Sequence, residues 1–162
     1  AEAARAVGYE YMAITDHSKA LAMANGLDEE RVVAFAKRVR ELDQAALGIR
    51  VFSGLECDIR RDGSMDIAED ALAELDFVIG SVHSYMNLEA AEMTDRLLRV
   101  LESPSIRLLG HATGRILLHR EAYPFDFDAV VTKAAERRVW LSSWSIPTRI
   151  IPNICSTCPT AF

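Results

Sequence analysis

Short apolar segments alternate with amphipathic helical segments along most of the chain, and this alternation restricts the possible folds more than any other feature. The predicted strands are residues 11–15, 51–55, 77–82, 106–109 and 139–141. Strands that alternate with helices pair in parallel, because each helix returns the chain to the edge of the sheet where the previous strand began. The alternation therefore predicts an α/β fold with a parallel sheet.

The helices between these strands have recognisable boundaries. The helix after the first strand should begin beyond Asp28, a favourable N-cap, and end before Gly48. Its apolar stripe, at spacings of three and four residues, is Val32, Phe35, Val39, Leu42 and Ala46. Other helices are predicted at residues 2–8, 67–75 and 88–102, and after an N-cap at Asp126.

The composition is that of an ordinary globular domain with a core: 162 residues, of which 50% are hydrophobic. A net charge of −6 argues against a nucleic-acid coat and is compatible with a site that attracts metal cations. No apolar run approaches the roughly 20 residues of a membrane span, and we find no signal peptide. We therefore expect a cytoplasmic location and no membrane partner, while the oligomeric state stays open.

Potential metal ligands occur at the ends of four successive predicted strands. His17 follows the first strand, Glu56 closes the second, His83 ends the third, and His111 comes one glycine after the fourth. A lone histidine at a strand end is more often a hydrogen-bonded loop residue, but here three of four histidines share this position, and His119 alone is expected to face solvent. Parallel strands bring their carboxyl ends to one face, and imidazole and carboxylate groups bind Zn²⁺, Mn²⁺ or Fe²⁺. The pattern predicts a divalent metal site there.

Four neighbouring residues each allow two interpretations. Asp16 could hold the adjacent imidazole through a hydrogen bond, or it could cap a turn. Asp58 lies on the same strand face as Glu56 and could support the site or remain solvated. Lys19 and Arg115 could bind the phosphate of a substrate, although a solvated basic side chain is the commoner outcome.

Four segments, in this order along the chain, resemble motifs of the PHP (polymerase and histidinol phosphatase) domain. The segments are Thr15–Ser18, Gly54–Ile59, Ser81–Ser84 and Gly110–Arg115. The last segment, continued by Leu117-Leu118 and Tyr123, most resembles the domain at the C-terminal end of bacterial family X DNA polymerases. The resemblance extends over about residues 1–141.

This resemblance implies a (β/α)7 TIM-like barrel with a site for up to three metal ions at the carboxyl ends of its strands. It implies that His17, Glu56, His83 and His111 are ligands and that Glu56 bridges two ions. The implied activity is 3′→5′ exonuclease or end-processing phosphoesterase action on DNA in repair, with the polymerase supplying contact with DNA. We expect water activated by metal, rather than a side chain, to be the nucleophile.

The chain also departs from the family. The opening His-x-His and closing Asp-x-His motifs are absent, and the chain starts within a helix without an initiator methionine, so we expect residues upstream. Residues 1–141 are thus predicted to be a partial domain, with an incomplete barrel and ligand set and impaired activity alone. Residues 142–162 form an atypical tail, because no acidic residue follows Glu136, which indicates a frameshift or a divergent end. The Cys155-x-x-Cys158 pair in this tail is a weak indication of a metal site.

Two other functions remain open from the sequence. One is a small-molecule phosphatase of the histidinol phosphatase type, which would act on a phosphate ester and not on single-stranded DNA. The other is a non-catalytic structural module, which would contain no metal ion when purified.

Overall fold

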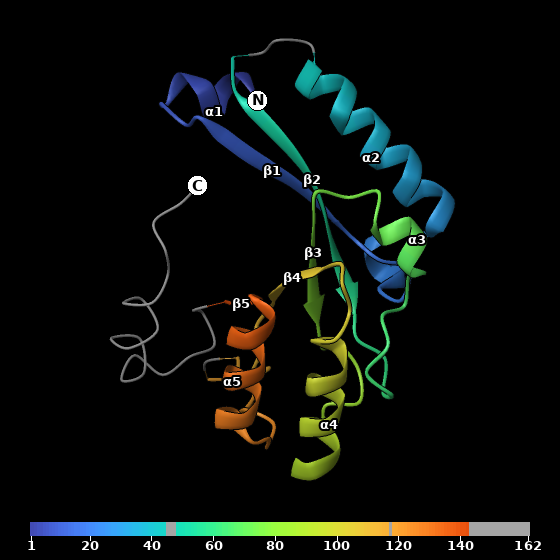
Figure 1. Cartoon of the computed structure of the whole chain (residues 1–162), viewed down its shortest axis with the longest axis vertical. Coiled ribbons are helices and arrows are strands. Elements are labelled where there is room, and N and C mark those ends of the chain that lie inside the picture. The colour runs from blue at the N-terminus through green and yellow to red at the C-terminus, as the bar shows by residue number, and fades with distance from the viewer. Residues whose placement is uncertain (45–47, 117, 143–162) are drawn as a thin grey trace.

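The structure is a computed structural model that describes residues 1–44, 48–116 and 118–142 (Figure 1). Its five strands form one parallel sheet in the order β1-β2-β3-β4-β5. The strands are β1 (Tyr11–His17), β2 (Arg50–Asp58), β3 (Phe77–Ser81), β4 (Ile106–Leu109) and β5 (Trp140–Leu141). The helices are α1 (Glu2–Ala6), the 3₁₀ helix η1 (Ala22–Ala24), α2 (Glu29–Gln44), α3 (Glu69–Leu72), α4 (Ala90–Val100) and α5 (Phe127–Arg137). The predicted α/β class and parallel sheet are confirmed.

Strands β1 and β2 continue beyond their predicted ends at residues 15 and 55. Their register pairs His17 with Glu56, so both potential ligands lie within the sheet rather than after it. Helix α3 is shorter than the predicted segment 67–75, and soon after it the Asp76 carboxylate accepts a hydrogen bond from the backbone N–H of Ser53 at 2.7 Å. The predicted tail, with Cys155 and Cys158, lies outside the described residues apart from its first residue.

Both predicted N-caps are present. The Asp28 carboxylate accepts a hydrogen bond from the backbone N–H of Arg31 at 3.0 Å, and Asp126 does the same for Ala129. These bonds satisfy N–H groups that the first turn of a helix leaves without a partner.

Helix α2 packs against β2 with a stripe of side chains that differs from the prediction. Its buried apolar side chains are Val32, Ala36 and Val39. Leu42 is 42% exposed, so its predicted burial is wrong, and Ala46 lies outside the described residues. The stripe is continued instead by the half-buried Asp43, because a residue four positions after Val39 returns to the same face. The Asp43 carboxylate accepts a hydrogen bond from the Val51 N–H at 2.8 Å.

The two faces of the sheet carry different side chains, because successive residues of a strand point to opposite sides. On the face covered by α2, Val51 of β2 packs with Val39. On the other face, the Tyr11 and Phe52 rings meet edge to face with centroids 6.4 Å apart. Glu56 lies on this second face, four residues after Phe52.

The helices that follow β3 and β4 complete the packed part of the chain. Helices α4 and α5 lie side by side in Figure 1, and they contact each other. Buried side chains of both helices, including Leu97 and Val130, join the main apolar core under β3 and β4. None of the helices among the described residues combines the length and apolar character needed to cross a membrane.

Candidate metal centre

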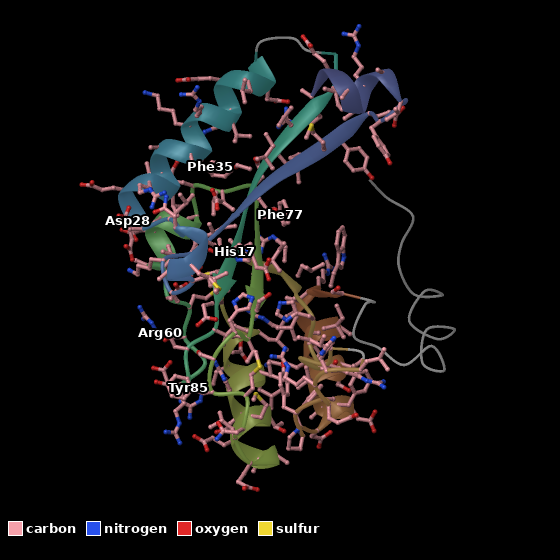
Figure 2. The ribbon with its side chains drawn as sticks, turned by 180° about the vertical axis from the view of Figure 1, so that it is seen from behind. His17, Asp28, Phe35, Arg60, Phe77 and Tyr85 are labelled. Carbon is pink, nitrogen blue, oxygen red and sulfur yellow. The ribbon has the colours of Figure 1, made fainter. Side chains whose placement is uncertain are left out.

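Three predicted ligands meet at the carboxyl ends of β1, β2 and β3. His17, Glu56 and His83 each offer one ligand atom, and these atoms all lie within 4.8 Å of one another. The distance from His17 Nδ1 to Glu56 Oε2 is 3.8 Å, and that from His83 Nε2 to Glu56 Oε1 is 3.3 Å. Figure 2 shows His17 in the middle of the molecule, where β1 ends. This group could hold a metal ion.

His111 approaches the same carboxylate from the end of β4. Its Nε2 atom is 3.1 Å from Glu56 Oε1, and its ring centroid is 5.1 Å from that of His83. It does not belong to the group of three within 4.8 Å. Glu56 is therefore the centre of the arrangement, with imidazole groups from three other segments around it.

The backbone around His111 is tightly constrained. A Cβ at the preceding Gly110 would lie 2.4 Å from the Ser81 hydroxyl oxygen, so only glycine fits there. His111 itself has a φ of +29°, and the Gly114 N–H donates to its carbonyl at 2.7 Å, which closes a turn. A residue other than glycine keeps such a backbone conformation only when its surroundings hold it, and this is common at functional sites.

The charges of the site depend on one another. The imidazoles of His111 and His83 hold the pKa of the Glu56 carboxyl well below its usual range. A hydrogen bond donated to Asp58, together with the Glu56 carboxylate, raises the pKa of His83 to about 9. Both shifts reflect the same contacts, because a hydrogen bond between imidazole and carboxylate favours the charged form of each group.

Asp58 fixes the orientation of the His83 ring. Its Oδ1 atom lies 3.1 Å from His83 Nδ1 and also accepts the His83 backbone N–H at 3.1 Å. When the ring is neutral, a proton on Nδ1 satisfies Asp58 and leaves the lone pair of Nε2 directed toward Glu56. Carboxylates hold metal-binding histidines in this way.

The remaining predicted site residues lie at the edge of this arrangement. The Asp16 carboxylate accepts the backbone N–H of the next residue at 2.8 Å, so it binds the main chain rather than the imidazole. Lys19 Nζ pairs with Glu29 at 2.6 Å. Arg115 and His119 are both exposed in the loop after β4.

Two buried residues that the sequence reasoning missed hold the end of β2. The Asp66 carboxylate accepts the Cys57 S–H at 3.0 Å, the Asp58 N–H at 3.1 Å and the Ala20 N–H at 2.8 Å. The Ser18 hydroxyl accepts the same Asp58 N–H at 2.9 Å. The signal for Asp66 was the predicted Asp62-Gly63 turn, because this turn folds the chain back antiparallel beside the end of β2.

Arg96 is a third residue that the sequence did not indicate. Its guanidinium is buried in α4 and donates to the carbonyl groups of Arg60 at 2.9 Å, Ser84 at 3.0 Å and Tyr85 at 3.3 Å. It also donates to the carbonyl of Ile59. One side chain therefore joins the loops that follow β2 and β3, and these loops flank Asp58 and His83.

The sequence is similar to several known proteins. It is 38% identical over 150 residues to the DNA polymerase/3′-5′ exonuclease PolX of Bacillus subtilis. The aligned region covers 93% of this chain and 26% of that protein. It is 39% identical over 95 residues to a probable phosphatase of Clostridium acetobutylicum, covering 56% of this chain and 36% of the relative. A probable phosphatase of Acetivibrio thermocellus is 30% identical over 156 residues, covering 92% of this chain and 59% of the relative.

The chain thus spans about a quarter of the Bacillus relative and less than two thirds of both phosphatases. Members of the PHP domain family bind metal ions, and residues 1–139 match this family. The match includes all four segments that carry the potential ligands. The chain therefore belongs to the PHP domain family.

Proposed function

We propose that this chain is a metal-dependent phosphoesterase domain that removes nucleotides from the 3′ end of DNA as part of a family X DNA polymerase. One observation carries the proposal. The Glu56 carboxylate has imidazole nitrogens of His17, His83 and His111 at 3.8, 3.3 and 3.1 Å from its oxygens. A carboxylate surrounded by imidazole nitrogens is a set of groups that binds divalent cations.

The residues fit a divalent cation. His17 Nδ1 is buried and has no hydrogen-bond partner among the described residues, an arrangement that is unfavourable unless the nitrogen binds something else. Imidazole nitrogen and carboxylate oxygen together suit Zn²⁺, Mn²⁺ or Fe²⁺. His17, Glu56 and His83 would hold one ion, and Glu56 with His111 would contribute to a second.

A bound cation of this kind supplies positive charge and Lewis acidity beside a phosphate group. Asp58 keeps the His83 ring in one orientation, so the Nε2 atom stays available to the cation. Arg115 has an exposed side chain four residues after His111 and could bind a phosphate oxygen. Lys19 could do so only after leaving Glu29, to which it is bonded at 2.6 Å.

We also propose that the sheet belongs to a TIM-like (β/α)7 barrel in the longer protein. Strands in the sequential order β1-β2-β3-β4-β5, without reversal, form the arrangement that can curl into a barrel. The face that carries Glu56 also carries Tyr11, which is 50% exposed, and the half-buried Phe52 and Phe77. Further strands would cover these aromatic side chains inside a closed barrel.

A DNA end is favoured over a small ester by the openness of the site. The side chains of His17 and His111 are 35% and 38% exposed, so the end of a polymer could reach the carboxylate. The exonuclease named among the relatives supports the same choice. The second candidate is hydrolysis of a small phosphate monoester, which the similarity to two probable phosphatases favours.

The test is hydrolysis of 3′-labelled single-stranded DNA and of histidinol phosphate by the full-length protein with Mn²⁺. We expect release of nucleotides from DNA, and a loss of about a hundredfold or more in His111→Ala, since a ligand of the cation is removed. His119→Ala is the matched control, because this exposed histidine lies in the same loop. Hydrolysis of histidinol phosphate alone would favour the second candidate, and equal rates in both variants would contradict the site.

A further inference from the structure

A cavity of about 590 Å³ opens directly beside the candidate metal centre. Its lining includes the buried Asp58 and half-buried His83, together with the exposed side chains of Arg60, Arg61 and Tyr85. In Figure 2, Arg60 and Tyr85 lie on one side of the molecule, below the end of β1 that carries His17. The cavity is therefore continuous with the groups that would act on a phosphate.

Tyr85 has an unusual backbone conformation. Its φ is +50°, in the left-handed region, which is unfavourable for a bulky L-residue, and its side chain is 57% exposed. Local sequence preference does not explain this conformation, because Gly or Asn would adopt it more readily. The buried Arg96 guanidinium holds it by binding the carbonyls of Ser84 and Tyr85. The fold thus keeps an exposed aromatic ring at the rim of the cavity.

An arginine side chain that is paired with Glu92 is held beside this ring. The Arg61 guanidinium carbon is 6.0 Å from the Tyr85 ring centroid, and Glu92 orients the guanidinium with contacts of 2.8 and 2.9 Å. The two carboxylates that line the cavity have other partners, since Asp58 binds His83 and Asp62 binds Ser64. A ring next to a guanidinium suits a nucleobase and its phosphate, because bases stack on aromatic side chains and phosphates bind arginine.

We propose that this cavity is a nucleotide-binding subsite in which a base of the DNA strand stacks on Tyr85 while Arg61 binds the adjacent phosphate. The subsite rests on the proposed action on DNA. It gives the site a preference for a strand with bases over a phosphate diester that lacks them. Tyr85 acts by holding the strand and does not participate in the chemical step.

The test compares Tyr85→Asn, Tyr85→Trp and the unaltered full-length protein. Asparagine tolerates a positive φ, so Tyr85→Asn removes the ring without adding backbone strain. For each protein we would measure kcat/KM on single-stranded oligothymidylate and on a strand of the same length built of abasic residues, together with the thermal midpoint. We expect Tyr85→Asn to lower the ratio of kcat/KM on oligothymidylate to kcat/KM on the abasic strand about tenfold, through a higher KM for oligothymidylate and with no fall in the thermal midpoint. Tyr85→Trp should retain this ratio.

Tyr9→Ala is the matched control. Tyr9 is also an exposed tyrosine, at 63%, but it lies just before the first residue of β1, at the end of the strand away from His17. It should leave the ratio unchanged. An unchanged ratio in Tyr85→Asn would overturn the subsite, even if the protein hydrolyses DNA. Absence of DNA hydrolysis in the unaltered protein would instead overturn the proposed function on which the subsite rests.

Discussion

The Nδ1 atom of His83 lies 3.1 Å from the Oδ1 atom of Asp58, and the same oxygen accepts the His83 backbone N–H. Asp58 is 5% exposed, whereas the His83 side chain is 20% exposed, so the carboxylate is the buried partner of this pair. The contact leaves the opposite ring nitrogen of His83 facing Glu56 at 3.3 Å. A ring held in this way is ready to bind a cation without first losing rotational freedom.

Replacing Asp58 with Asn should therefore weaken metal binding without unfolding the chain. The amide keeps the shape of the side chain but loses the charge that favours a proton on Nδ1. We expect the Kd for Mn²⁺ or Zn²⁺ to rise about 10- to 100-fold. Calorimetric titration of the metal-free protein measures this change. Asp95→Asn is the control, because Asp95 is 71% exposed on α4, and an equal effect in both variants would show that Asp58 has no specific role.

Arg96 should be important for stability, because its buried guanidinium satisfies four carbonyl groups in two loops. Arg96→Met leaves those carbonyls without a donor, so we expect the free energy of unfolding to fall by about 3 kcal/mol or more. Urea unfolding of the metal-free protein provides the measurement. Arg99→Met on the next turn of α4 removes a side chain that is 65% exposed and should change stability by less than about 0.5 kcal/mol. Equal losses for the two variants would contradict this role.

The Cys57 thiol should be chemically inert in the folded chain. The residue is fully buried, and burial together with the adjacent Asp66 carboxylate raises the pKa of its thiol well above the usual range. Alkylation requires the thiolate, so iodoacetamide at about pH 8 should modify Cys57 on the order of a hundredfold more slowly than in denaturant. Peptide mass spectrometry separates Cys57 from the other cysteines. Rapid modification under native conditions would show that the end of β2 opens to solvent.

The sequence predicted the strands well, because short β-rich runs between turn signals leave few alternatives. It also placed three potential ligands near the carboxyl ends of those strands, although β2 ends at Asp58 rather than Glu56 and β3 ends at Ser81, two residues before His83. Parallel pairing then brings His17, Glu56 and His83 together. It could not specify that His111 would contact Glu56 while lying outside that group, because this depends on the turn at Gly110 and the space beside Ser81.

Other features depend on contacts that a linear pattern does not contain. Leu42 fits an apolar stripe by spacing, but the position of α2 on β2 buries Asp43 more than Leu42. Arg96 occupies a helix position where a charged residue normally faces solvent. Its burial is possible only because two distant loops present their carbonyls to it. Asp66 was within reach of prediction, since the Asp62-Gly63 turn determines which residues lie beside the end of β2.

The central claim is that Glu56 is the common ligand of a divalent metal centre. Titration of the metal-free protein with Mn²⁺, followed by calorimetry, tests this claim most directly when the unaltered protein is compared with Glu56→Gln. The substitution keeps the size of the side chain and removes its charge, and circular dichroism checks that the variant is folded. We predict saturable binding to the unaltered protein and an affinity at least about a hundredfold lower in Glu56→Gln. Equal affinity in the two proteins would contradict the account.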